Sequence, residues 1–158
     1  MRKRVLDEGA AGRTPFHDEN WLDLEQLAEV EITSEDAAHP IENALLVGAA
    51  GGWKAGAPGV QKIRLLFSEP QPLRRILLEF QEAERERNQE FVLRWSPDVE
   101  GGWREIVRQQ FGFSPGGATR EIEDYRVEIS AARMLELEID PDRGAGSAYA
   151  SLQRFCLA

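Results

Sequence analysis

Cysteine and histidine are scarce in this chain of 158 residues, and their scarcity excludes several kinds of site. Cys156 is the only cysteine, so no intramolecular disulfide and no thiolate-rich zinc site can form. Because Cys156 lies in a short apolar run with no histidine nearby in sequence, we expect a buried, unreactive thiol. His17 and His39 are too few for a typical zinc site without thiolates. The sequence therefore predicts neither a metal nor a cofactor.

Two familiar nucleotide-binding motifs are missing as well. No Gly-Lys dipeptide occurs, which excludes a phosphate-binding P-loop. The triplet Gly144-Ala145-Gly146 opens no predicted helix, so it is not a dinucleotide-binding turn. Carboxylates are plentiful, but most of those in predicted strands fall on the outward, charged phase, and nothing places a glycosidase pair in one cleft. We therefore expect a protein that is not an enzyme.

Basic residues and long apolar runs are also in short supply. Asp and Glu number 28 against 19 Lys and Arg, which gives a net charge of −9. The negative electrostatic potential of such a chain repels phosphate backbones and anionic lipid, so neither nucleic acid nor a membrane surface is an expected partner. No apolar run approaches membrane-spanning length, and no apolar segment of a signal peptide follows the basic first four residues. These features favour a cytoplasmic protein.

What the chain does contain is a repeated alternation of apolar and polar residues. One phase of each run is apolar and the other mostly charged, which is typical of antiparallel strands with one face against a core. The runs cover residues 30–32, 63–67, 76–80, 91–95, 125–129 and 135–139, with a further apolar strand at 155–157. Proline- and glycine-rich turns at 68–72, 96–102, 114–117 and 140–144 separate them. We predict an all-β fold, an antiparallel β-sandwich of the jelly-roll type with about eight strands.

The remaining segments complete this organisation. Residues 40–46 fit one short helix with Pro40 in its first turn. The mixed charges of residues 82–90 indicate a solvated hairpin end rather than a docking site. Residues 1–20 are polar and aperiodic, and we interpret them as a flexible N-terminal arm before a single domain over residues 21–158.

A family resemblance lies in residues 30–45, which read Val-Glu-Ile-Thr-Ser-Glu-Asp-Ala-Ala-His-Pro-Ile-Glu-Asn-Ala-Leu. Gly52-Trp53-Lys54-Ala55 and then Ile63-Arg64-Leu65 follow. This order resembles the opening of the galactose-binding-like, or discoidin-like (F5/8 type C-like), β-sandwich superfamily. The likeness is closest to the N-terminal domain of the scaffold proteins of DNA single-strand-break repair. It extends in strand order over about residues 28–158 and weakens after Phe80.

The resemblance implies an eight-stranded jelly roll that binds ligands at loops on one end. Its members bind sugars, lipid head groups, proteins or damaged DNA, so the fold does not settle the ligand. Members with structural calcium usually carry acidic residues in the loop before the motif tryptophan. Here that loop, residues 48–52, has no oxygen-bearing side chain, so we expect no calcium. The net charge of −9 also argues against DNA binding, because a negative protein repels the phosphate backbone.

Within the resembling run, a polar cluster stands beside the first core strand. It has two interpretations: its side chains serve turns and loops of the domain itself, or they contact a ligand. The structural interpretation is favoured. Trp53, which follows two glycines, is expected to be a core residue that closes the sandwich. The cluster consists of Ser34, Glu35, Asp36, His39, Glu42 and Asn43.

The segment 104–125 carries the predicted binding residues. It combines forked hydrogen-bond donors with flat aromatic rings, and a sugar needs a ring for its C–H face and polar groups for its hydroxyls. Phe111 and Phe113 share one strand phase and are alternatively core residues, while Arg108 and Gln110 lie on the opposite phase. The predicted ligand-binding residues are Arg108, Gln110, Phe111, Phe113, Arg120 and Tyr125.

These observations favour a non-catalytic module that binds a carbohydrate or glycoconjugate through loops at one end of the sandwich. The alternative is a protein–protein interaction module of the scaffold type, with a protein as the ligand. A weaker third interpretation is an accessory domain of a hydrolase.

Overall fold

The computed structural model describes residues 20–158, so the arm expected over residues 1–20 lies almost wholly outside the described part. Two short helices and eight strands occur within the described range. In chain order they are α2 (Leu24–Leu27), β1 (Ala28–Ile32), α3 (Glu42–Leu45), β2 (Trp53–Lys54), β3 (Gln61–Gln81), β4 (Arg87–Ser96), β5 (Arg104–Phe113), β6 (Arg120–Asp140), β7 (Ser151–Leu152) and β8 (Arg154–Leu157). No helix in this range is long and apolar enough to cross a membrane.

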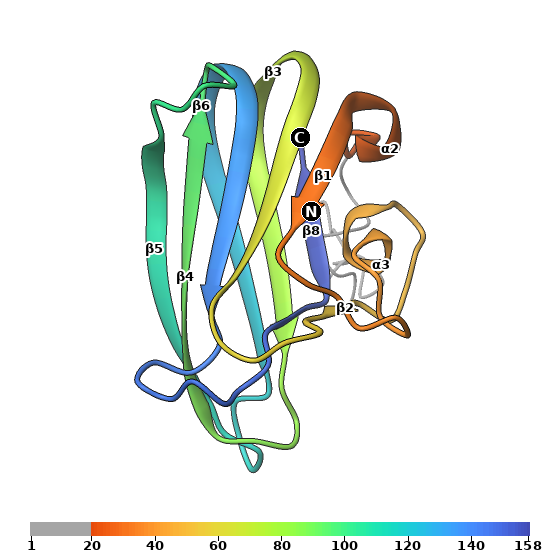
Figure 1. The fold of residues 1–158 in the computed structure, drawn as a ribbon. Helices are drawn as coiled ribbons and strands as arrows, with labels where there is room; N and C mark the ends of the chain where they lie inside the picture. The colour runs from red at the N-terminus through yellow and green to blue at the C-terminus, as the bar shows by residue number, and fades with distance from the viewer. Residues whose placement is uncertain (1–19) are drawn as a thin grey trace, which may run out of the picture.

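Six strands form two antiparallel layers that share β3 and β6 (Figure 1), and β2 and β7 pair separately as a two-stranded antiparallel sheet. One layer runs in the order β1-β3-β6-β4-β5. In the other layer, β8 pairs with the second half of β3, which pairs in turn with the first half of β6. Both long strands arch over at the top of the molecule (Figure 1), where their pairing shifts register between Leu66 and Arg75. Each long strand therefore contributes to both layers, as strands do at the corners of sandwiches.

The alternation in the sequence explains the core between the layers. On β3, Ile63, Leu65 and Phe67 in the first half and Ile76, Leu78 and Phe80 in the second are fully buried. Rings from the two layers meet there: Phe80 stacks on Phe91 at 5.2 Å, and Tyr125 meets Phe91 edge-on at 6.4 Å. The predicted antiparallel β-sandwich is thus confirmed, and the turn predicted at residues 68–72 is the bend within β3.

The helices and the motif tryptophan close one side of the sandwich. Helix α3 lies inside the predicted segment 40–46 and buries Ala44 and Leu45. Helix α2 was not predicted, because a single turn around the buried Leu24 is too short to show helical periodicity. Trp53 is 1% exposed and its Nε1 donates a 3.1 Å hydrogen bond to the carbonyl of Ser34, which confirms its predicted core position.

The polar cluster beside β1 is used largely within the fold. The Ser34 hydroxyl donates to Gln61 Oε1 at 2.6 Å, and Glu35 accepts a 3.0 Å hydrogen bond from the backbone N–H of Ile41. The Asn43 amide donates to the carbonyl of Gly52 at 3.1 Å and so tethers the neighbouring loop. The structural interpretation is confirmed for these residues.

The expectation of a solvated hairpin end at residues 82–90 holds only in part. Residues 83–86 are exposed, but Arg87 and Gln89 are buried because β4 begins at Arg87 and its inward phase includes both. Glu121 is likewise buried, since it lies on the inward phase of β6 opposite Phe80. Polar residues thus occupy the inward phase at this end of the sandwich, contrary to the expectation that charges point outward.

Candidate ligand-binding groove

A groove of about 680 Å³ lies at the end of the sandwich where β1 ends and β4 begins. One wall consists of β2 with Asp36 and His39, and the facing wall is the β3–β4 connection, residues 81–87. Residues 148–153, which lead into β8, complete the groove. Three segments far apart in sequence, which include the short strand pair of β2 with β7, therefore form one hollow at this end of the fold.

Tyr149 is the exposed aromatic residue of the groove. Its neighbours Ala148 and Ala150 are buried, and their carbonyls accept 2.9 Å hydrogen bonds from the backbone N–H groups of Gly59 and Ala55. This extended backbone directs the Tyr149 side chain away from the core, and the residue remains 52% exposed. A tyrosine held open in a groove offers a flat face for C–H groups together with a hydroxyl.

His39 and Asp36 form a paired group on the β2 wall. His39 Nδ1 lies 2.7 Å from Asp36 Oδ2, and this hydrogen bond, opposed by partial burial, lowers the pKa of the Asp36 carboxyl. Backbone hydrogen bonds link Asp36 and His39 to Lys54 on β2, so the pair is held in place. Because Nδ1 is hydrogen-bonded to Asp36, Nε2 of His39 is left available for a hydrogen bond to a ligand.

Arg87 anchors the opposite wall. Its Nε donates to Glu82 at 2.9 Å, and its Nη1 donates to Gln89 at 3.1 Å and to the carbonyl of Pro141 at 2.9 Å. The guanidinium also lies 4.6 Å from the centre of the Phe113 ring. These contacts fix the β3–β4 connection against β4 and the segment after β6.

Further exposed side chains give the groove hydrogen-bonding groups. Exposed Lys54, Glu84 and Arg85 add donors and an acceptor to the tyrosine ring and the histidine. Among residues 20–158, no three His, Cys, Asp or Glu side chains are grouped so as to hold a metal ion. Burial raises the pKa of the Cys156 thiol to about 11, so this thiol is a poor nucleophile.

One sequence pattern resembles a nucleophile elbow. Gly112-Phe113-Ser114-Pro115-Gly116 fits Gly-x-Ser-x-Gly, but it joins β5 to β6 through a turn in which the N–H of Gly117 bonds to the carbonyl of Ser114. A nucleophile elbow requires a strand-to-helix turn. The pattern here is a connection between strands.

The six predicted binding residues do not form one site. Arg108 and Gln110 are exposed on the outer face of β5, where Arg108 pairs with Glu90 at 2.8 Å and with Glu105 at 3.0 Å. Phe113 is a core residue at 1% exposure, and the half-buried Phe111 packs against it at 4.9 Å. The half-buried Tyr125 packs on Phe91 between the layers, and Arg120 pairs with Glu79 on the second layer.

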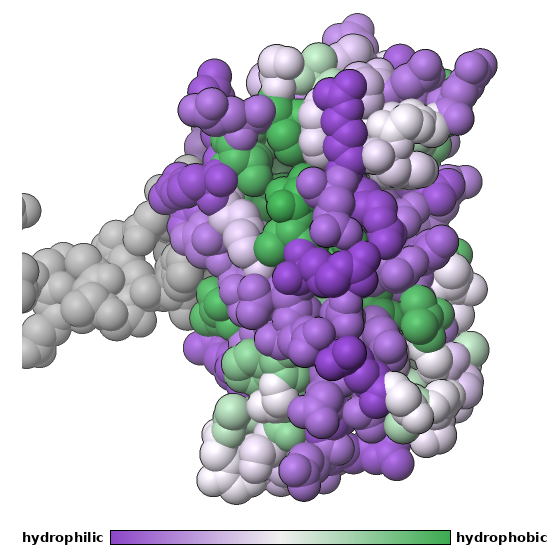
Figure 2. All heavy atoms as spheres, turned by 90° about the vertical axis from the view of Figure 1, so that its left-hand side faces the viewer, coloured by the Kyte–Doolittle hydropathy of each residue, from purple (hydrophilic) through white to green (hydrophobic). Residues whose placement is uncertain are grey.

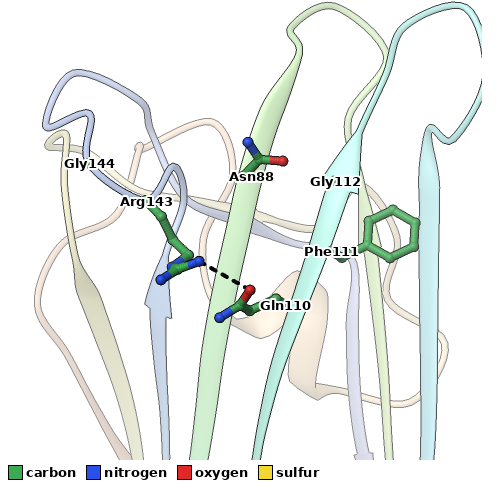
Figure 3. Close-up of a pocket in the computed structure, with 6 residues that line it drawn as sticks. All are labelled: Asn88, Gln110, Phe111, Gly112, Arg143 and Gly144. Carbon is green, nitrogen blue, oxygen red and sulfur yellow. Dashed lines mark hydrogen bonds between the residues drawn. The ribbon is translucent and has the colours of Figure 1, made fainter.

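Two of the six do line a common pocket. Gln110 and Phe111 border a separate, smaller hollow of about 530 Å³, whose lining residues are drawn in Figure 3. Figure 3 shows the Gln110 side chain on one side of β5 and the Phe111 ring on the other. The edge of the molecule that carries β5 is largely hydrophilic, with hydrophobic side chains gathered in its upper half (Figure 2).

Sequence reasoning missed the groove because its residues come from three separate loops. Asp36 and His39 were noted only as parts of the polar cluster, and Tyr149 was not noted at all. A lone tyrosine between alanines in a glycine- and alanine-rich loop was the available signal, since it has no strand phase that would place it in the core.

No protein-family model and no curated protein matches this sequence. Solved structures match its fold. The CBM32-3 module from a family 31 glycoside hydrolase of Clostridium perfringens has a TM-score of 0.64 at 21% identity, with 87% of this chain and 93% of the module covered. A chitosan-binding module 1 from a chitosanase/glucanase of Paenibacillus sp. IK-5 has a TM-score of 0.61 at 20% identity, with 87% and 98% covered. This chain shares the β-sandwich fold of these modules.

The same fold also occurs as one part of a larger enzyme. The Ruminococcus gnavus GH29 fucosidase matches with a TM-score of 0.64 at 10% identity, over 86% of this chain but only 26% of the fucosidase. At these identities the likeness shows the fold alone. The antiparallel β-sandwich that the resemblance implied is confirmed as the fold of residues 20–158.

Proposed function

We propose that this chain is a non-catalytic carbohydrate-binding module that holds its ligand in the groove beside Tyr149. The observation that carries the proposal is the exposed tyrosine in a groove rimmed by fixed hydrogen-bonding groups. Hydroxyl-rich ligands with one apolar ring face match this combination, because the ring covers the C–H groups while His39, Lys54 and Arg85 meet hydroxyls.

The named activities of the structural neighbours support the same class of ligand. One neighbour is a chitosan-binding module, one is a pectin-binding module, and another is a CBM32 in complex with 4,5-unsaturated mannuronic acid. Each spans nearly its whole length in the match, at 90% or more of its own chain.

Binding should be measured by glycan-array screening followed by calorimetry on the sugars retained. We expect Tyr149→Ala to weaken binding by about 2 kcal/mol, the loss typical of a central aromatic contact, or roughly thirtyfold in Kd. We expect His39→Ala to cost about 1 kcal/mol, the value of one hydrogen bond. Val99→Ala is the matched control, because Val99 is an exposed residue of the β4–β5 connection at the opposite end.

Retention of no glycan, or equal affinity of the Tyr149→Ala variant and the wild type, would overturn this proposal. Far-UV circular dichroism of each variant checks that the fold is intact. Loss of binding only in variants that are unfolded would also count against a role for Tyr149 in binding.

A protein-interaction module of the scaffold type is the second candidate. The likeness of residues 30–55 to the repair-scaffold domain supports it, and so does the free edge of β5 within residues 20–158. An edge strand of ten residues offers unpaired backbone groups that a partner strand can bind. Pull-down of a protein that the Tyr149→Ala variant still captures, in the absence of glycan binding, would favour this candidate.

A further inference from the structure

The pocket beside the groove carries an inference that rests on the proposed function and extends it. We propose that this pocket is a second subsite, and that the ligand is an oligosaccharide that reaches both hollows rather than a single sugar. The pocket is lined by Asn88, Gln110, Phe111, Gly112, Arg143 and Gly144 (Figure 3).

The linings of the two hollows adjoin along the chain. Arg87 lines the groove on the inward phase of β4, and Asn88, the next residue, lines the pocket on the outward phase. Gly144 belongs to the pocket and Ala148 to the groove, and four residues of chain span at most about 14 Å. The start of β4 and the segment after β6 therefore lie between the hollows, and an oligosaccharide that reaches both passes around this end of the sandwich.

Hydrogen bonds hold the Arg143 and Gln110 side chains and the backbone of Asn88 in place. Arg143 Nη1 donates to Gln110 Oε1 at 3.1 Å, the contact dashed in Figure 3, and Arg143 Nε lies 3.0 Å from Glu90 Oε2. The backbone N–H of Arg143 donates to the carbonyl of Asn88 at 2.8 Å, and the backbone N–H of Asn88 donates to Asp142 Oδ1 at 3.1 Å. Groups fixed in this way lose little entropy when they bind.

The charge balance of the pocket favours a ligand that presents hydroxyl groups. Glu90 compensates the Arg143 guanidinium, so the pocket presents amide and guanidinium N–H groups without an uncompensated charge. The Asn88 side chain makes no hydrogen bond within residues 20–158, and it is exposed beside Gln110. Amides of this kind donate to and accept from the hydroxyls of a sugar.

Gly112 keeps the pocket open. A Cβ atom at this position would lie 3.2 Å from Asn88 Oδ1, so any side chain here occupies the space in front of Asn88. The backbone of Gly112 is in an ordinary extended strand, and a β-branched residue is compatible with that conformation. Gly112→Val therefore fills the pocket and displaces the Asn88 side chain, while the strand backbone keeps its conformation.

The test compares chain lengths of one sugar on the full chain. The probes are glucosamine with chitosan oligomers, and galacturonic acid with pectin-derived oligogalacturonides, measured by calorimetry. We expect the wild type to bind an oligomer at least tenfold more tightly than its monosaccharide. We expect Asn88→Ala and Gly112→Val to reduce oligomer affinity about fivefold to tenfold, the effect of one or two hydrogen bonds, and to leave monosaccharide affinity unchanged.

Gly116→Val is the matched control, because Gly116 lies in the β5–β6 turn with no atom near its Cβ position and lines neither hollow. Equal affinity of the wild type for monomer and oligomer would overturn the second subsite while leaving the groove as the binding site. Oligomer affinity unaffected by both pocket variants would do the same. If none of the probes and no glycan on an array binds, the proposed function itself fails, and the inference fails with it.

Discussion

The side-chain amide of Gln89 on β4 donates a 3.1 Å hydrogen bond to Oε1 of Glu121 on β6, and both residues are buried between the two layers. The second carboxylate oxygen, Glu121 Oε2, has no hydrogen-bond partner within residues 20–158. Burial, together with the nearby carboxylate of Glu123, raises the pKa of Glu121 to about 8. At neutral pH the native state therefore keeps a proton on this side chain.

This proton predicts a decline of stability with pH. Between the ordinary pKa of 4.5 and about 8, the unfolded chain has released the proton of Glu121 while the folded chain retains it. The free energy of unfolding then falls as pH rises, by at most about 1.4 kcal/mol per pH unit from this group, and the loss is complete above about pH 8. We expect Glu121→Gln, which mimics the protonated acid, to remove this part of the pH dependence.

Urea unfolding from about pH 5 to about pH 9 measures the effect. The control is Glu128→Gln, because Glu128 is exposed on the same strand. Parallel pH profiles of the wild type and the Glu121→Gln variant would show that Glu121 is ionised in the folded protein.

A second prediction separates core from surface on β5. Phe113→Ala removes a fully buried ring that packs on Phe111 and Arg87, so we expect it to cost about 3–5 kcal/mol of unfolding free energy. Arg108→Ala removes two surface ion pairs and should cost less than about 1 kcal/mol. Thermal or urea unfolding of both variants is the measurement, and a comparable loss for the two would contradict these positions.

Gly56 carries a third prediction. Its N–H donates to the Ser34 hydroxyl at 3.0 Å, and a Cβ here would lie 2.6 Å from the backbone oxygen of Glu35. We expect Gly56→Ala to destabilise the protein by about 1–3 kcal/mol through this overlap. Gly146→Ala, at a position with no neighbouring atom, should have little effect, and equal midpoints of thermal unfolding for the two variants would refute the close approach.

The fourth prediction concerns calcium. The loop at residues 48–52 offers no side-chain oxygen, so we expect the midpoint of thermal unfolding to be the same with calcium and with EDTA. A shift of several degrees on addition of EDTA would reveal a calcium site.

The fold could be predicted because its strands alternate clearly. Residues 63–67 and 76–80 show the period of two, and each proved to be one half of β3. That the two halves form one arched strand was not visible, since the bend at Pro70 and Pro72 looks like an ordinary turn in the sequence.

The candidate site was much less predictable. Phe113 and Gln110 were grouped because they are neighbours in sequence, although strand alternation places one in the core and the other on the surface. His39 and Tyr149 lie far apart in sequence and line the same groove only after the loops are brought together. Because Arg87 and Gln89 are polar, the sequence predicts that they face solvent. Their burial depends on hydrogen bonds to residues distant in sequence, which the sequence does not reveal.

The arching of β3 and β6 has a consequence for how the chain folds. Their pairing joins Gln61 to Ile139 and Gln81 to Arg120, so both layers depend on contacts between residues that are distant in sequence. The chain between the paired residues must close into a loop, at a cost in entropy, before the strand pairing contributes to stability. All-β topologies of this kind therefore fold in about milliseconds to seconds. Neither layer can form without the other, so we expect residues 20–158 to acquire their structure in a single, slow cooperative step.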